Sequence, residues 1–198
     1  MKENLIKSVK YLNEVTIPVC DKYADGRTNS VEDENTIITL LKEKYGEENI
    51  EVPTARNWYD VRIFGYPVNI KSSTFKGNDN FSAKAAILYS LTDLSEEECM
   101  VNDWQGFQNA LKNNSGKENN RDYYCVVLNK NTNEVHLIGL KELQKISVNG
   151  NNLPFQINWG KNTNPVKRTY SEAYDLLVGT YKESVRKKVG VHSGYEYL

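Results

Sequence analysis

The chain has 198 residues, of which 39% are hydrophobic and 26% charged, and its formal net charge is −1. These values predict a soluble protein with a real hydrophobic core and a single domain spanning residues 1–198. They do not favour a protein that coats nucleic acid through bulk positive charge.

Several further classes are disfavoured. No stretch is long enough to span a membrane, and the N-terminus lacks the apolar segment of a signal peptide. Three cysteines without metal-ligand spacing predict reduced thiols, so we expect a cytoplasmic protein. Only two histidines are present, which gives little support to a zinc enzyme or a histidine-based nuclease.

In chain order, residues 3–23 predict a helix interrupted near Pro18. Residues 30–45 predict a second helix that opens with a capping box from Ser30 to Asp33. Its apolar face is expected to hold Val31, Ile38, Leu41 and Tyr45.

Glu34 falls on that apolar face of the second helix. A carboxylate in an apolar stripe is costly unless a metal or a lysine pairs with it. The alternative is that Glu34 sits at the edge of the stripe, near the helix N-terminus, where the helix dipole favours an acid.

Residues 58–73 predict two short strands joined by a tight turn at Gly65-Tyr66. Side chains alternate faces along a strand, so Asn69 and Lys71 should share the face opposite to the apolar Val68 and Ile70. Asp60 lies on the preceding strand, within reach across the hairpin. A carboxylate, an amide and an ammonium would then converge on one patch of sheet. The alternative is a surface hairpin whose polar residues simply face water.

Such a grouping suits a hard cation such as Mg²⁺, which takes oxygen ligands and keeps several waters. Asp60 can supply charge, the Asn69 side chain a neutral oxygen, and the Ile70 backbone carbonyl a third ligand. Lys71 could orient or deprotonate a water beside the metal. These groups together predict hydrolysis of phosphodiesters.

The second half of the chain predicts further helices and strands. Residues 81–94 should form a helix capped by Ser82, and residues 104–112 a shorter one. Residues 123–128 are typical of a central strand, paired to a strand at residues 134–140 through a turn. A capping box from Thr169 to Glu172 predicts the start of the last helix.

The helix with Glu34, followed by a hairpin with Asp60 and Asn69-Ile70-Lys71, resembles the PD-(D/E)xK nucleases. Within them the chain is similar to a type II restriction endonuclease over roughly residues 25–130 and the last helix. The resemblance implies an α/β fold with a restriction-endonuclease-like core, in which helices flank a mixed β-sheet.

The resemblance also implies roles for the individual residues. Asp60 would bind Mg²⁺, and Glu34 would bind it directly or through water. Lys71 would activate water or stabilise developing charge. Asn69 departs from the pattern, because it stands where the family has Asp or Glu. It would complete the metal shell or position water, and the lost charge implies weaker metal binding.

Charge is unevenly distributed along the chain. Residues 32–60 hold eight acidic and three basic residues, whereas residues 161–188 hold seven basic and three acidic ones. An acidic region near a metal and a basic region near phosphates suit a metal-dependent nuclease. The alternative is that both regions are ordinary solvated helix faces.

Base recognition needs side chains with paired donors and acceptors, and three loops offer them. They comprise Arg27 and Asn29 before the acidic helix, Ser72, Ser73 and Lys76 after the lysine strand, and Asn158, Trp159, Lys161, Asn162, Lys167 and Arg168 before the last helix. The third loop is the favoured groove-facing segment, with a surface loop over a packed Trp159 as its alternative. Lys76, Lys84 and Lys161 are the candidate phosphate contacts.

The sequence therefore predicts a Mg²⁺-dependent type II restriction endonuclease. It would cut double-stranded DNA at a short specific sequence, as a homodimer whose two-fold axis matches that of the site. One alternative is a repair or junction nuclease of the same fold. The other is a non-catalytic DNA-binding protein, in which Asn69 marks lost activity.

Overall fold

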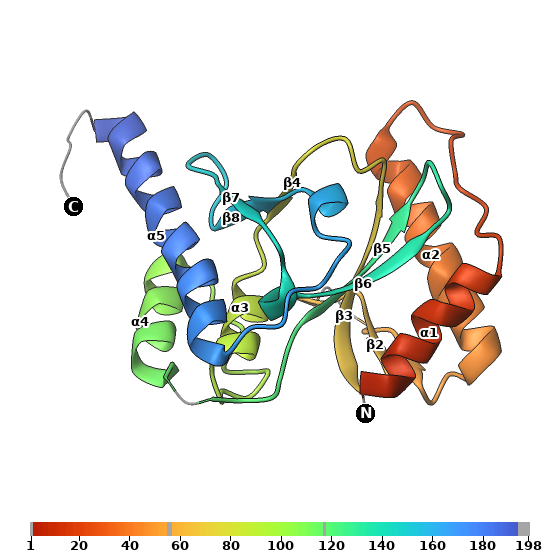
Figure 1. Cartoon of the computed structure of the whole chain (residues 1–198), viewed down its shortest axis with the longest axis horizontal. Coiled ribbons are helices and arrows are strands. Elements are labelled where there is room, and N and C mark those ends of the chain that lie inside the picture. Colours follow the sequence, from red (N-terminus) through yellow and green to blue (C-terminus); the bar gives the residue numbers. More distant parts are fainter. Residues whose placement is uncertain (1, 55–56, 117, 194–198) are drawn as a thin grey trace. The chain divides into compact units, whose positions relative to one another are not determined.

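A computed structural model describes residues 2–54, 57–116 and 118–193 (Figure 1). The chain divides into two compact units. Unit 1 comprises Met1–Lys76 and Tyr124–Ile138, and unit 2 comprises Gly77–Tyr123 and Gly139–Leu198. The prediction of a single domain over residues 1–198 stays a prediction, and each unit is described by itself.

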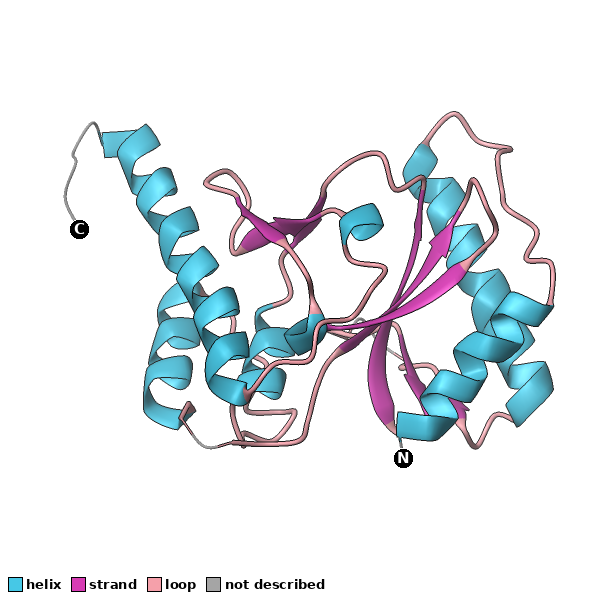
Figure 2. Cartoon of the chain, viewed as in Figure 1, coloured by secondary structure: helices cyan, strands magenta, loops and turns pink. Residues whose placement is uncertain are grey.

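Unit 1 contains a five-stranded sheet with the order β1-β2-β3-β5-β6 (Figure 2). Its strands are β1 (Ile50–Glu51), β2 (Val61–Ile63), β3 (Tyr66–Ser73), β5 (Tyr124–Asn129) and β6 (Val135–Gly139). The β1–β2 and β2–β3 pairs are antiparallel, whereas β3 and β5 are parallel. The sheet is therefore mixed.

Helices α1 (Lys2–Glu14) and α2 (Gly26–Tyr45) belong to the same unit. Apolar side chains from both helices and from the strands form one buried cluster, in which Leu5, Leu12, Ile37, Val68 and Ile70 are fully covered. The predicted α/β class, a mixed sheet flanked by helices, is confirmed.

The N-terminal helix is shorter than predicted, because α1 ends at Glu14 and not near residue 23. The following residues include the β-branched Val15, Thr16 and Ile17, and Pro18 disfavours helical backbone in the residue before it. The backbone of Ile17 instead pairs with the Asn133 side chain, through bonds of 3.0 and 2.7 Å.

The predicted capping box at Ser30 is wrong, because α2 already begins at Gly26. Ser30 lies inside the helix, and its hydroxyl donates to the Gly26 carbonyl at 3.0 Å. Val31 is also not a core residue, since it is 52% exposed. The buried stripe of α2 runs instead through Asn29, Asp33, Ile37 and Leu41.

Unit 2 holds a small antiparallel sheet with the order β4-β8-β7 and three α-helices. Its strands are β4 (Asp79–Phe81), β7 (Ile146–Val148) and β8 (Phe155–Ile157). Its helices are α3 (Lys84–Leu91), α4 (Trp104–Asn114) and α5 (Tyr170–Ser193).

Helix α3 starts later than predicted, because Phe81 belongs to β4 and its ring stacks on Phe155 at 5.3 Å. The residue that caps α3 is Ala83 and not Ser82, and it makes no side-chain cap bond. The capping box of α5 is confirmed. The Thr169 backbone N–H donates to Glu172 at 2.8 Å, and the Glu172 N–H donates back to the Thr169 hydroxyl at 3.3 Å.

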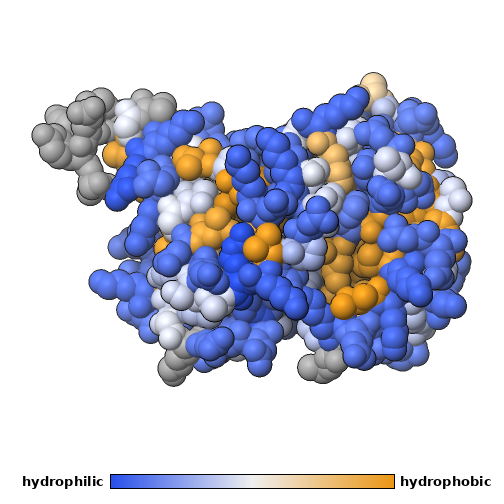
Figure 3. Space-filling view, viewed as in Figure 1, coloured by the Kyte–Doolittle hydropathy of each residue, from blue (hydrophilic) through white to orange (hydrophobic). Residues whose placement is uncertain are grey.

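Hydrophilic side chains cover much of the face shown in Figure 3. Within the described residues, no helix combines the length and apolar character needed to cross a membrane.

Candidate active site

The β2–β3 hairpin of unit 1 positions the first candidate residue, Asp60. Phe64 and Gly65 form the tight turn with φ of 50° and 80°, so the turn lies one residue earlier than predicted. Val61 pairs with Val68, which places Asp60 opposite Asn69. The Ile70 N–H donates to the Asp60 carboxylate at 2.8 Å, and the Asp60 N–H donates to the Val68 carbonyl at 3.0 Å.

The alternation predicted for β3 is present. Val68 and Ile70 are fully buried in the core of unit 1, whereas Asn69 and Lys71 are half-buried on the other face. The Lys71 side chain is 38% exposed. A half-buried lysine keeps access to solvent and still lies close to the acids beside it.

Glu34 reaches the same patch from α2. Its Oε1 lies 3.9 Å from the Lys71 Nζ, and its side chain is 21% exposed. Asp60 belongs to the same group of charges. Its carboxylate raises the pKa of Glu34, and Lys71 lowers the pKa of both acids. The structure thus assembles Asp60, Lys71 and Glu34 from three separate stretches of sequence.

Burial governs the electrostatics of this cluster. It raises the pKa of Glu34 to about 7, with Lys71 opposing the rise and Asp60 and Asp33 adding to it. Burial also raises the pKa of Asp60, against Lys71 and the Ile70 N–H, which lower it. Two acids in this environment hold their protons more tightly than in water, and a nearby cation would favour their ionised forms.

The oxygen atoms available here fit a hard divalent cation. In a strand, the N–H and C=O of one residue point to the same side, so the Ile70 carbonyl lies on the side of Asp60. Asp60, Glu34 and this carbonyl could hold Mg²⁺ together with several waters, and Asn69 could add a neutral oxygen. Within the described ranges, no three His, Cys, Asp or Glu side chains form a metal-binding group.

Sequence reasoning missed Asp33, whose side chain is fully buried beside this cluster. It accepts hydrogen bonds from the Cys20 N–H at 2.7 Å and the Ser72 hydroxyl at 2.6 Å. It also pairs with the Lys130 ammonium at 2.7 Å. The available signal was the four-residue spacing from Asn29 through Asp33 and Ile37 to Leu41, which marks Asp33 as an inward position.

The DNA-contact candidates of unit 1 are engaged to different degrees. Asn29 is buried, and its amide bonds both backbone groups of Tyr23. The Ser72 hydroxyl donates a hydrogen bond to Asp33, and the Ser73 hydroxyl accepts one from the Phe75 N–H at 3.2 Å. Lys76 is exposed. The side chain of Arg27 lies outside the described residues.

In unit 2, two of the candidates are covered by the protein. Trp159 is 2% exposed and bonds Asp79 through its indole N–H. Asn162 is 1% exposed and bonds both backbone groups of Lys145. Trp159 therefore packs beneath this loop, as the alternative for that segment predicted, and Asn162 is covered as well.

The other candidates of unit 2 lie nearer the surface. Lys161 and Lys167 are exposed. Asn158 caps the short 3₁₀ segment Trp159–Lys161. Lys84 donates to the Asn102 carbonyl at 2.6 Å, and Arg168 donates to the Lys141 carbonyl at 3.4 Å. Whether any of them contacts DNA stays a prediction.

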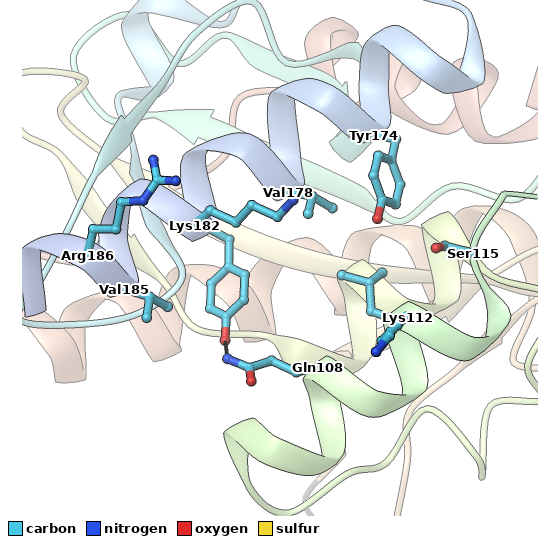
Figure 4. A pocket seen from close by; sticks show the side chains of 10 residues that line it. Gln108, Lys112, Ser115, Tyr174, Val178, Lys182, Val185 and Arg186 are labelled. Atoms are coloured by element: carbon cyan, nitrogen blue, oxygen red, sulfur yellow. Dashed lines mark hydrogen bonds between the residues drawn. The ribbon is translucent and has the colours of Figure 1, made fainter. Parts of the chain in front are cut away.

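Unit 2 also has a cavity of about 520 Å³ lined by α4, α5 and Ser115 (Figure 4). Its walls include Leu111, Val178 and the cations Lys112, Lys182 and Arg186. No carboxylate is among its lining residues in the part of the chain that the structure describes. This cavity therefore lacks the groups for metal-assisted hydrolysis.

The sequence matches no protein-family model and no curated protein. One solved structure, described as "Restriction endonuclease in complex with substrate DNA", is similar at 18% identity and a TM-score of 0.29. The match covers 63% of this chain and 51% of that chain, so it spans about half the length of the other protein.

Proposed function

We propose that this chain is a Mg²⁺-dependent type II restriction endonuclease that cleaves double-stranded DNA at a short specific sequence. The observation that carries the proposal is the convergence of Asp60, Glu34 and Lys71 on one half-buried patch of unit 1. These three residues occur in the order of the PD-(D/E)xK pattern, from which Asn69 departs.

Asp60, Glu34 and the Ile70 carbonyl would hold the metal. When bound, Mg²⁺ would supply Lewis acidity toward the scissile phosphate and make a nearby water easier to deprotonate. The Ile70 N–H fixes the Asp60 carboxylate at 2.8 Å, so Asp60 is already oriented before any ligand arrives. Preorganised charged groups of this kind supply much of the rate enhancement in hydrolytic enzymes.

Lys71 would act on the reacting water and phosphate. Its ammonium, 3.9 Å from Glu34, can orient a water for attack on phosphorus, take its proton after losing its own, or stabilise negative charge on the phosphate. The attack forms a P–O bond to the water oxygen and breaks the P–O bond to the leaving sugar oxygen. Asn69 would contribute a neutral oxygen, so the metal would bind more weakly than it would with an acidic residue at this position.

The proposal includes a homodimer. Within the described residues, one chain presents one such site, which can reach one scissile phosphate at a time, whereas a double-strand cut needs two. Sedimentation of the chain with and without DNA measures the mass. A monomer in both states that releases mainly nicked circles would remove the dimer and favour a nicking or repair enzyme.

The function is tested by digestion of chromosome-sized DNA of known sequence, which contains every short site, followed by mapping of the ends. The proposal expects discrete fragments with Mg²⁺ and none with EDTA, and every end at one short sequence. Ends without a shared sequence would indicate a structure-selective nuclease. DNA retention without any cleavage would indicate a non-catalytic binding protein.

A further inference from the structure

The buried carboxylate of Asp33 is fully satisfied by partners from three different segments of unit 1. One oxygen accepts from the Cys20 N–H in the loop before α2, at 2.7 Å. The other accepts from the Ser72 hydroxyl on β3 at 2.6 Å and pairs with Lys130, in the turn after β5, at 2.7 Å. A carboxylate with no exposed surface persists only when its oxygens are bonded and its charge is compensated.

The position of Asp33 gives these bonds a consequence for the active site. Asp33 immediately precedes Glu34 on α2, and Ser72 immediately follows Lys71 on β3. The Asp33–Ser72 bond therefore joins the neighbours of the two residues whose charged groups meet at 3.9 Å. If α2 shifted along β3, the Asp33–Ser72 bond would break and Glu34 would move away from Lys71 at the same time.

Glu34 is placed by α2, whose Ile37 and Leu41 are buried in the core of unit 1. β2 begins at Val61 and pairs with β3 up to Val68. Among the described residues, no strand therefore pairs with β3 beyond Asn69 on that side. Glu34 and Lys71 meet beside this uncovered stretch, where both side chains retain exposed surface. Their alignment then depends on how firmly the helix is fixed to the strand.

We propose that Asp33 is a positioning residue that fixes Glu34 against Lys71 by bonding Ser72, and that ties the loop containing Cys20 to the same point. The inference rests on the proposed nuclease function. Asn29, one turn earlier on α2, holds the same loop through Tyr23 at 3.0 and 2.7 Å. The segment before α2 and the active-site strand are thus held by one helix.

The experiment compares Ser72→Ala, which removes only the helix-to-strand bond, with Ser72→Thr, which keeps a hydroxyl, and with Asp33→Asn. Thr36→Ala is the matched control, because Thr36 lies on the same helix and its hydroxyl donates within that helix, to the Glu32 carbonyl at 2.9 Å. Each variant is measured for the single-turnover cleavage rate at saturating Mg²⁺ and for DNA affinity without metal.

Ser72→Ala is expected to lower the cleavage rate by about tenfold to 100-fold, since small displacements of catalytic groups carry large penalties in rate. DNA affinity should stay unchanged, Ser72→Thr should restore most of the rate, and Thr36→Ala should match the wild type. A rate loss explained by weaker DNA binding would assign Ser72 to a DNA contact and overturn the positioning role. A wild-type rate for Ser72→Ala would overturn it as well.

A second readout does not depend on activity. The coupling between Glu34 and Lys71 is the non-additive part of the unfolding free energies of Glu34→Gln, Lys71→Met and the double variant. This coupling should be present in the wild-type background and vanish with Ser72→Ala. If the wild type cleaves no DNA, the proposed function fails and the coupling alone decides the positioning role, which is overturned if Ser72→Ala keeps the coupling in full.

Discussion

Each unit of this chain has an acid whose pKa is raised to about 7, and the two acids differ in what surrounds them. Glu34 in unit 1 lies beside a second acid and a half-exposed lysine. The Asp122 carboxylate in unit 2 accepts hydrogen bonds from the backbone, from the Tyr123 N–H at 2.9 Å and the Lys141 N–H at 3.1 Å. The ammonium of Lys141 turns to Asn119 at 3.0 Å.

The difference shows that a raised pKa does not by itself mark a reactive site. Burial is the largest cause of the rise at both positions. The side chains of Glu34 and Lys71 are partly exposed, however, so a ligand can reach them. Asp122 is buried, and its bonds join chain segments to each other. A functional acid needs both a shifted pKa and a side chain that a ligand can reach.

The largest effect is expected from a comparison of the two lysines. Lys71→Ala should reduce cleavage by at least about 100-fold and leave DNA binding largely intact, because a group that acts in proton transfer or charge stabilisation is lost. Lys141→Ala should keep the cleavage rate, since the Lys141 ammonium donates to the Asn119 carbonyl in unit 2. Single-turnover cleavage and filter binding measure both. Near-normal cleavage by Lys71→Ala would remove it from the mechanism.

A pH effect follows from Glu34. Its carboxyl must ionise to bind Mg²⁺, and below about pH 7 the metal-free protein holds it protonated. The Mg²⁺ concentration for half-maximal cleavage should therefore rise as pH falls below about 7, by up to about tenfold per unit, and level off above it. Glu34→Gln should flatten this dependence. A wild-type Mg²⁺ requirement that is constant from pH 6 to 8 would exclude Glu34 as a ligand.

A smaller gain is expected from Asn69→Asp, which supplies the acid that Asn69 replaces. One more charge near the cation should lower the Mg²⁺ requirement by roughly tenfold. In the metal-free protein the added carboxylate should also lower stability, by repulsion with Asp60 across the hairpin. Titration of the cleavage rate with Mg²⁺ is the test, and a clear rise in the requirement would mean that Asn69 does not contact the metal.

The smallest effect on cleavage is expected in unit 2. The folded-state pKa of Asp122 lies above its ordinary value of 3.8, so folding favours its protonated form. Its contribution to the unfolding free energy therefore falls as pH rises from about 4 to 7. Asp122→Asn should reduce this slope without abolishing it, because the pKa of Glu34 is also raised to about 7, and it should leave cleavage unchanged. Urea unfolding at several pH values measures it, and an unaltered slope would assign the pH dependence to other groups.

Sequence reasoning succeeded where the determinants are local. The alternation of Val68, Asn69, Ile70 and Lys71 follows from strand geometry alone, and it correctly placed Lys71 on the partly exposed face. The capping box at Thr169 is also local, because its reciprocal bonds span three residues. Both features needed no knowledge of the rest of the fold.

Sequence reasoning failed where distant segments decide the outcome. Ser30 and Asp33 have the same capping signature as Thr169 and Glu172, yet Asp33 is drawn into the interior by Cys20, Ser72 and Lys130. The strands of unit 2 were missed for another reason. β4, β7 and β8 have three residues each, which is too short for a period of two to appear.

Asp60→Asn and Asp122→Asn, measured side by side, decide whether the cluster around Asp60 in unit 1 cleaves DNA. Both variants replace an acid by its amide, and both are assayed for Mg²⁺-dependent cleavage of DNA under conditions where circular dichroism shows them folded. Asp60→Asn should bind DNA without cutting it, whereas Asp122→Asn should cut at the wild-type rate. Wild-type cleavage by folded Asp60→Asn would exclude this cluster as the active site.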